Sequence, residues 1–389
     1  MEDYGSGAEA CSVGFRGSSH RVEGPGAVST VLSRGGDQMK IYLNTDGTGR
    51  GGPNRWAARF IQELRERGYV VTHDVNTRFD AAYLNIATAG IEKLVERRIP
   101  FLYRVAGCNI PEWFPVMGKL MDDAHRQQND LIRHALEISP KVIYQSQWAK
   151  AQLDRLLYKR ENHFAVVYNG VSKDFFMPGP SHDVPVIAAA GSLRYRYRLK
   201  TLFRLSDELA LPHQILIAGA LDSENEVVLH ERLQAGQSDV KVRYAGDLAE
   251  PDWAEALKRC DVLFHPVCGD SCPNVVVEAL MSGVAIVAPR FGGTAELVGR
   301  GGILFECEPW DYFSPTYTKN AVDACRNVLA ERAHYRREAR LRAEHLLDLQ
   351  QMVDAYLQEL NLPKRIVPGI MKKSKVAIAK VKDHLRPKK

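Results

Sequence analysis

The amino-acid sequence predicts an α/β protein with two doubly wound parallel sheets. The first observation is that short apolar runs alternate with amphipathic stretches along most of the chain, which is the pattern of strands joined by crossover helices. The second is length, because 389 residues with 45% hydrophobic content can bury two sizeable cores. We therefore expect two domains, each with helices on both faces of its sheet.

The first domain is expected over residues 39–175. A helix with Trp56, Phe60 and Leu64 on one face follows its first strand, and Gly68 ends that helix. Residues 131–138 form a further helical segment. Strands are predicted at 39–43, 69–72, 83–86, 100–105, 142–145 and 164–168.

The second domain is expected over residues 183–333, after a linker at about 172–183 in which two prolines flank a glycine. Its first helix is predicted from Lys200 to about Leu209. Further helices are predicted at 275–281 and within 321–360. Strands are predicted at 186–190, 215–218, 242–245, 262–264, 285–288 and 302–305.

Composition sets the expected setting of the protein. Residues 1–38 are rich in Gly and Ser without apolar periodicity, so we expect a disordered leader, and no segment resembles a signal peptide. Seven cysteines without a CxxC pair indicate reduced thiols and a cytoplasmic protein. No metal or cofactor is expected. The adjacent acids Asp122 and Asp123 are interpreted as a solvated helix start rather than a metal motif.

The stretch 262–296 has the order strand, loop, helix, strand. Pro273 and Asn274 open its helix, which starts where parallel sheets bind ligands, outside the carboxyl ends of the strands. The free N–H groups of a helix start favour anions, and a diphosphate is the commonest biological anion that fits. A diphosphate would repel Asp270 and Glu278, which have seven residues between them, so their expected partners are hydroxyl groups on either side. A nucleotide sugar has this layout of ribose, diphosphate and sugar.

This acidic pair, together with the turn Gly292-Gly293-Thr294-Ala295-Glu296, resembles the signature of the retaining GT-B glycosyltransferases of group 1, or family four. The first acid of that group is usually Glu, where this chain has Asp270. The resemblance implies two Rossmann-like domains that face each other across a cleft, a donor-sugar contact for Asp270 and a ribose contact for Glu278. The alternative is that Asp270 caps the helix and Glu278 faces solvent. The resemblance also implies that four residues hold the sugar and its phosphate: Ser271, Cys272, Pro273 and Asn274.

Three further features of the second half follow from the resemblance. Arg194 and Lys200 resemble the basic pair that binds the donor diphosphate, where positive charge stabilises a departing nucleoside diphosphate. Arg196 and Arg198 in the same segment leave a solvated basic loop as the alternative. The backbone around Gly246 is expected to read the nucleobase. The helical segment 334–361 is expected to return to the first domain.

The glycine-rich loop 47–52 has two interpretations. Its spacing satisfies the dinucleotide-binding pattern, with Asp74 at the end of the second strand as the ribose acid, which would suit an NAD-dependent enzyme. In GT-B proteins a similar loop lets the backbone approach the donor phosphates and the acceptor. We favour the second interpretation and assign Gly51 and Gly52 to donor binding.

The acceptor side departs from the family at Ala106. Related enzymes often carry His or Asp at the strand-end position that we align with Ala106, and alanine can neither take a proton nor hydrogen-bond a sugar. The candidate acceptor-side groups are Asp46, Asn109 and Glu112. For His265 at the end of a strand, packing or the sugar pocket is favoured over a role as general base.

The C-terminal residues 362–389 form a basic tail. From Lys364 on, the tail carries ten Lys or Arg and one acid, with apolar residues on one helical face. Such a segment could lie on an anionic membrane, and a disordered solubilising tail is the equal alternative. A nucleic-acid partner is not expected, because aromatic residues are not interleaved with the charges.

The sequence thus predicts a metal-independent retaining glycosyltransferase. It would move a sugar from a UDP- or GDP-linked donor to a hydroxyl acceptor, which could be a saccharide, a glycolipid or a small molecule. Because of Ala106, a catalytically silent nucleotide-sugar-binding or scaffold protein is the first alternative. An NAD-dependent enzyme that uses the loop 47–52 is the second.

Overall fold

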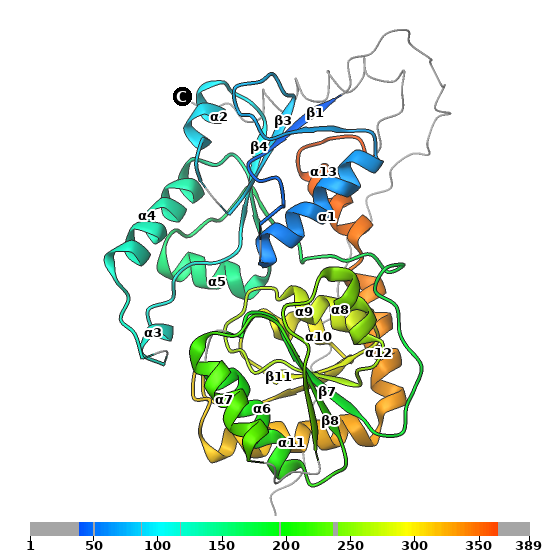
Figure 1. The fold of residues 1–389 in the computed structure, drawn as a ribbon. Helices are drawn as coiled ribbons and strands as arrows, with labels where there is room; N and C mark the ends of the chain where they lie inside the picture. The colour runs from blue at the N-terminus through cyan, green and yellow to red at the C-terminus, as the bar shows by residue number, and fades with distance from the viewer. Residues whose placement is uncertain are drawn as a thin grey trace, which may run out of the picture.

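The protein is described by a computed structural model that covers residues 39–49, 51–86, 88–116, 118–193, 196–235 and 240–364. Two α/β domains lie one above the other in Figure 1, the first in blue to teal and the second in green to orange. Three predictions fall outside the described residues: the leader 1–38, Arg194, and the tail beyond Lys364.

The first domain contains a parallel sheet of six strands in the order β2-β1-β3-β4-β5-β6. The chain leaves β1 toward β2 and then returns to the other side of β1, so a topological switch point lies at β1, where such sheets bind ligands. The strands are β1 (Lys40–Leu43), β2 (Val70–Thr72), β3 (Ala81–Asn85), β4 (Phe101–Val105), β5 (Val142–Tyr144) and β6 (Phe164–Val166); the helices are α1 (Gly52–Glu66), α2 (Ile91–Glu96), α3 (Trp113–Val116), α4 (Asp123–Ile138) and α5 (Gln147–Leu156).

The second domain repeats this plan with the order β12-β11-β10-β7-β8-β9, also parallel. Its switch point lies between β7 and β10. The strands are β7 (Val186–Ala190), β8 (Gln214–Ala218), β9 (Lys241–Tyr244), β10 (Val262–Phe264), β11 (Ala285–Pro289) and β12 (Gly302–Phe305); the helices are α6 (Arg196–Leu209), α7 (Ser223–Gln234), α8 (Glu250–Leu257), α9 (Asn274–Met281), α10 (Thr294–Val298), α11 (Pro315–Ala330) and α12 (Arg332–Leu346).

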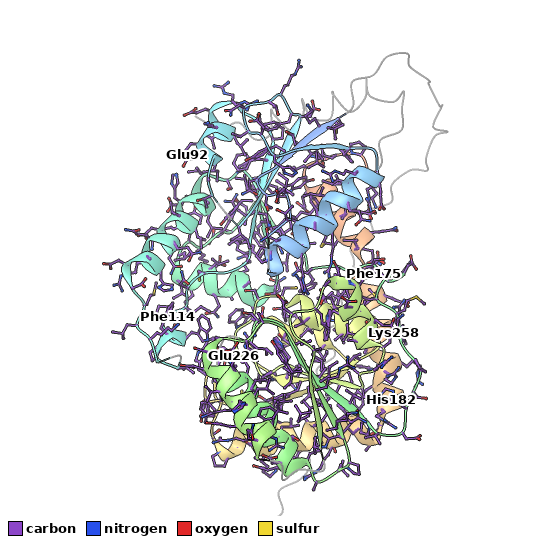
Figure 2. The ribbon with its side chains drawn as sticks, in the orientation of Figure 1. Glu92, Phe114, Phe175, His182, Glu226 and Lys258 are labelled. Atoms are coloured by element: carbon purple, nitrogen blue, oxygen red, sulfur yellow. The ribbon has the colours of Figure 1, made fainter. Side chains whose placement is uncertain are left out.

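The inner strands of both sheets are buried on both faces, as their apolar runs require, whereas the edge strand β9 is largely exposed. Side chains fill the layers between sheet and helices in each domain (Figure 2). The apolar face of α1 packs into the first core, where Trp56 stacks on Phe60 with ring centroids 4.7 Å apart. The predicted fold, two doubly wound domains of the GT-B type, is confirmed.

The last described helix, α13 (Leu349–Glu359), packs on the first domain beside α1 (Figure 1). Its Val353, Tyr356 and Leu357 are fully buried in the first core, and Tyr83 donates its hydroxyl proton to the Tyr356 carbonyl at 3.0 Å. The chain therefore passes between the domains twice. The two crossings pair at Val171, whose N–H and carbonyl bond the backbone of residues 347 and 349.

The predicted strand ends agree with the structure or differ from it by one or two residues. Two predicted helices start too late: α4 begins at Asp123 and not at residue 131, and α6 begins at Arg196 and not at Lys200. The added turn of α6 is held by Tyr197, whose ring stacks on Tyr312 at 3.8 Å and whose carbonyl accepts the Thr201 hydroxyl proton. Asp122 caps the start of α4 by accepting the His125 N–H, in agreement with the helix-start interpretation. None of the helices in the described ranges is long and apolar enough to cross a bilayer.

Candidate functional site

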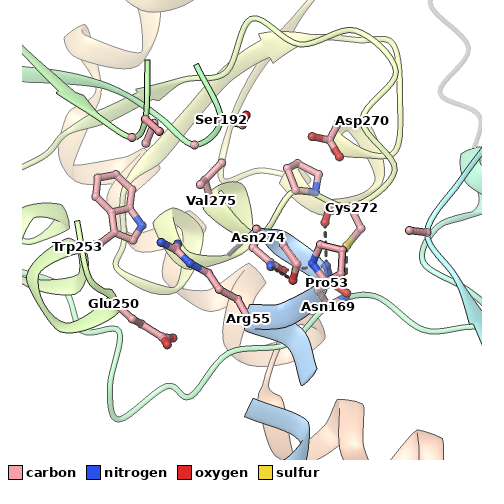
Figure 3. A pocket seen from close by; sticks show the side chains of 18 of the residues that line it. Pro53, Arg55, Asn169, Ser192, Glu250, Trp253, Asp270, Cys272, Asn274 and Val275 are labelled. Atoms are coloured by element: carbon pink, nitrogen blue, oxygen red, sulfur yellow. Dashed lines mark hydrogen bonds between the residues drawn. The ribbon is translucent and has the colours of Figure 1, made fainter. Parts of the chain in front are cut away.

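A cavity of about 940 Å³ lies between the two domains, at the carboxyl ends of both sheets. Figure 3 shows side chains from both domains around it, with Asp270 and Cys272 at one end and Glu250 and Trp253 at the other. The segments that line it follow β1, β4 and β5 in the first domain and β7, β8, β9 and β10 in the second. They include the glycine loop (47, 49, 51–53), Ala106, Gly191, Ser192, residues 218–220 and 247–250, and 270–275.

The start of α9 borders this cavity as the sequence predicted. Pro273 stands at the N-cap, and no side chain caps the helix. Ser271, Cys272, Pro273 and Asn274 all line the cavity. The helix behind them is buried along its length, so its first turn is held firmly with its free N–H groups at the cavity edge.

The turn Gly292-Gly293 supports the loop that carries Asp270. Gly293 donates its N–H to the Asp270 carbonyl at 2.7 Å. A Cβ on Gly293 would meet the Ser271 carbonyl oxygen at 1.8 Å, so only glycine fits this approach. Glu296, the acid of the same turn, bonds the N–H groups of Gln147 and Trp148 at the start of α5. The motif therefore also ties the second domain to the first.

The electrostatics around Asp270 are set by burial and by Arg198. The Asp270 carboxylate lies 3.8 Å from Nε2 of His265, and its side chain is 32% exposed. Burial raises the pKa of Asp270, against the pull of Arg198 and of the backbone N–H groups of residues 271 and 272. Burial and Arg198 lower the pKa of His265 to about 3, so this imidazole is neutral near pH 7. His265 is thus a neutral group beside Asp270 at one end of the cavity.

Arg198 is the cationic side chain that sequence reasoning missed. It lines the cavity, whereas Lys200, two residues further along α6, is absent from the described lining. Two residues turn a helix by about 200°, so these two side chains leave it on nearly opposite faces. Sequence reasoning left Arg198 in a solvated basic segment.

Glu278 lies beneath the cavity and not on its surface. Its carboxylate is fully buried, accepts the indole N–H of Trp253 at 2.8 Å and pairs with Arg59 of the first domain at 2.5 Å. Arg59 also donates to Glu250 at 2.7 Å. The alternative of a solvent-facing Glu278 is therefore wrong. The predicted ribose contact stays a prediction, since Arg59 holds this carboxylate in the structure.

The other predicted residues divide into two groups. Gly51 and Gly52 line the cavity, as does Ala106. Four others are absent from the described lining: Gly246, Asp46, Asn109 and Glu112. Asp46 bonds the N–H and hydroxyl of Thr48 within its own turn, Asn109 bonds Asn129 and His125, and Glu112 pairs with Arg155 at 2.7 Å.

Asp74 is the acid that a dinucleotide site would need, and it lies outside the described lining of the cavity. It accepts the N–H of Asn76 at 2.9 Å in an exposed turn. The glycine loop and the ribose acid of the NAD interpretation are thus not brought together around this cavity.

Comparison with known proteins gives matches in sequence and in fold. Residues 184–314 match the family model of glycosyl transferases group 1. One subunit of the human phosphatidylinositol N-acetylglucosaminyltransferase is 27% identical over 149 residues, which are 37% of this chain and 30% of that protein. The match thus spans less than a third of the curated relative.

Solved structures of similar fold cover most of the chain. Sucrose-phosphate synthase from Thermosynechococcus elongatus has a TM-score of 0.67 at 15% identity, over 82% of this chain and 98% of that one. HepE of Anabaena, solved with UDP and glucose, has a TM-score of 0.64 at 18% identity, over 84% of this chain and 100% of that one. The chain therefore has the GT-B fold, and within its second domain residues 184–314 are similar to the glycosyl transferases group 1 family.

Proposed function

We propose that this protein is a metal-independent retaining glycosyltransferase that moves a sugar from a nucleotide-diphosphate sugar to a hydroxyl acceptor. The observation that carries the proposal is the interdomain cavity, in which the free start of α9, Arg198 and Asp270 lie together. The diphosphate would lie at the start of α9, where free N–H groups and the helix dipole favour anions. The family match of the second domain supports the same donor class.

The residues around the cavity have separate roles in this proposal. Arg198 stabilises the negative charge that develops as the nucleoside diphosphate departs. Asp270 accepts hydrogen bonds from sugar hydroxyls, and neutral His265 lies beside it without adding charge. A cation at the leaving group and a carboxylate at the sugar suit a transition state in which the sugar becomes oxocarbenium-like.

Ala106 leaves the acceptor without a side-chain base at that position. In retaining transfer the leaving phosphate can itself accept the proton of the incoming hydroxyl, so a base at Ala106 is not required. The acceptor would enter between the glycine loop and Ala106, on the first-domain side of the cavity. Contact between the domains around the donor would exclude water and suppress hydrolysis.

Uracil is the first base to test, in the form of UDP. The structurally similar HepE was solved with UDP and glucose, and that observation concerns HepE. In this chain the segment 247–250 and Trp253 line the far end of the cavity, where a nucleobase would lie. Backbone groups there would select the base.

A thermal-shift panel with UDP, GDP, ADP, dTDP and NAD tests the donor class. A ligand at a hundred times its dissociation constant stabilises the folded protein by about 2.7 kcal/mol. We expect one nucleoside diphosphate to stabilise wild type and to lose this effect in Arg198→Ala. Arg204→Ala is the matched control, because Arg204 lies on the same helix with an exposed side chain away from the described lining. Stabilisation by NAD alone would refute the proposal.

The alternative, a catalytically silent nucleotide-sugar-binding protein, rests on Ala106. A turnover assay distinguishes it from a transferase. A transferase releases the nucleoside diphosphate when donor and acceptor are mixed, and hydrolyses the donor slowly without acceptor. We expect release of UDP or GDP from the sugar-linked donor that stabilises the protein most. Tight binding with neither transfer nor hydrolysis would establish the scaffold role.

We also propose that the protein works in the cytoplasm, at the inner face of the membrane, through the tail 364–389. Its ten basic residues would be attracted to anionic lipid by about 1 kcal/mol each near the surface. Co-sedimentation with anionic liposomes, for the full chain and for a chain ending at residue 363, measures this. Equal binding by both chains would refute the membrane role.

A further inference from the structure

Arg104, at the carboxyl end of β4, is a buried cation without a carboxylate partner in the described structure. It is 1% exposed and still contributes to the cavity lining. Its guanidinium lies over the Trp56 ring, 4.2 Å from the centroid, and its Nε makes no hydrogen bond with the described residues. An arginine stays protonated even where burial lowers its pKa, and an uncompensated buried charge is costly. The site therefore has a positive charge to be balanced.

The hydrogen bonds of Arg104 fix the orientation of two asparagine amides. Nη1 donates to Asn85 Oδ1 at 2.7 Å, and Nη2 donates to Asn169 Oδ1 at 2.8 Å. Because Arg104 can only donate, both amide oxygens must face it and both amide nitrogens must point away. Arginine thus determines what each asparagine can bind next.

Both amide nitrogens bind the segments at the cavity edge. Asn85 Nδ2 donates to the Pro53 carbonyl at 3.1 Å. Asn169 Nδ2 donates to the Cys272 carbonyl at 2.8 Å and to Asn274 Oδ1 at 2.9 Å (Figure 3). Asn274 Nδ2 then donates to the Gly52 carbonyl at 3.0 Å, which closes the network.

The ends of this network are two helix starts from opposite domains. Gly52 and Pro53 begin α1, and Cys272 and Asn274 stand at the start of α9. The Cys272 carbonyl, which precedes α9, and the Asn274 side-chain oxygen could otherwise turn toward a bound anion and repel it. One buried cation therefore holds both helix starts in the orientation that receives an anion.

We propose that Arg104 is a positioning residue for the donor diphosphate, whose negative charge balances its own. This inference rests on the proposed function, because it takes the diphosphate at the start of α9 as given. Arg104 acts through Asn85, Asn169 and Asn274. In this way it would hold in place the leaving phosphate, which accepts the acceptor's proton because Ala106 cannot. The network also couples diphosphate binding to contact between the two domains.

The test compares UDP with uridine by titration calorimetry, or the stabilising diphosphate with its nucleoside if another base is chosen. In Arg104→Met we expect the affinity for UDP to fall at least tenfold and that for uridine less than threefold. Arg160→Met is the matched control. Arg160 is also buried in the first domain, binds the carbonyls of residues 136, 139 and 140, and is absent from the described lining. It should change neither affinity by more than threefold.

A second variant covers the case in which Arg104→Met does not fold. Asn85→Asp keeps the size of the side chain and gives Arg104 a carboxylate inside the protein, so the fold should be retained while UDP binding weakens at least tenfold. Unchanged UDP affinity in either folded variant, or equal losses for UDP and uridine, would overturn the inference. If wild type binds no nucleoside diphosphate, the proposed function itself is refuted and the inference with it.

Discussion

The pair formed by Arg59 and Glu278 gives the sharpest stability prediction. Arg59 is 8% exposed and Glu278 is fully buried, and the two lie in different domains with an N–O distance of 2.5 Å. Removing one partner of a buried ion pair leaves the other charge without compensation and typically costs about 3–5 kcal/mol. The second contact of Arg59, with the 32% exposed Glu250, adds at most about 1 kcal/mol. We expect Arg59→Met to lose about 3–5 kcal/mol of unfolding free energy.

Urea unfolding followed by circular dichroism measures this loss. Arg55→Met is the matched control, because Arg55 lies one turn earlier on α1, is 31% exposed, and is 3.9 Å from the same carboxylate. It should cost less than about 1 kcal/mol. The double variant Arg59→Met with Glu278→Leu removes both charges and should be more stable than Arg59→Met alone. Equal losses at Arg59 and Arg55, or fully additive losses in the double variant, would refute the reasoning.

Three further predictions concern pH, catalysis and packing. The pKa of His265 is about 3 in the folded protein and about 6.5 in the unfolded chain, so between these pH values only the unfolded chain binds the proton. The free energy of unfolding therefore decreases as the pH is lowered from 6.5, by about 2 kcal/mol at pH 5. His265→Asn should lose less stability than wild type between pH 7 and pH 5. Arg198→Met should slow sugar transfer about a hundredfold or more. Leu357→Ala, in the fully buried face of α13, should cost about 2–5 kcal/mol.

Each of these predictions has a control. Parallel pH–stability curves for wild type and His265→Asn would contradict the buried neutral imidazole. For transfer, Arg204→Met should keep the wild-type rate, and an equal loss there would remove the special role of Arg198. For packing, the exposed Gln358→Ala on the same helix should stay within about 0.5 kcal/mol of wild type. A similar loss at both positions would show that α13 does not depend on the first core.

Local patterns were sufficient to predict the strands and the start of α9. Apolar strand runs such as 262–264 must be buried on both faces. Pro273 is followed directly by the apolar residues of α9, so the helix can begin only there. Asp270 and the residues to Asn274 were found for the same reason, since sequence neighbours in one loop stay neighbours in space. Gly292 and Gly293 were recognised only as part of the family signature, and the structure shows that close backbone approach excludes a side chain there.

The roles of single charged side chains could not be predicted in this way. Arg198 and Lys200 are both basic and near in sequence, and only the helical turn decides which one reaches the cavity. Asp46, Asn109 and Glu112 are polar residues near strand ends or in loops, and each satisfies its hydrogen bonds locally. Local polarity shows that a residue can bind a ligand, and it does not show which direction the side chain takes.

The sequence by itself determined the two doubly wound domains, the family resemblance and the loop 270–274 that borders the cavity. These depend on periodicity and on residues close together in the chain. Only the tertiary structure decided that Arg59 binds Glu278 and that Arg104 connects two helix starts through three asparagines. These contacts join residues that lie between 19 and 222 positions apart in the chain, and no local pattern encodes such distances. They exist because the two domains meet, and their charges are balanced only there.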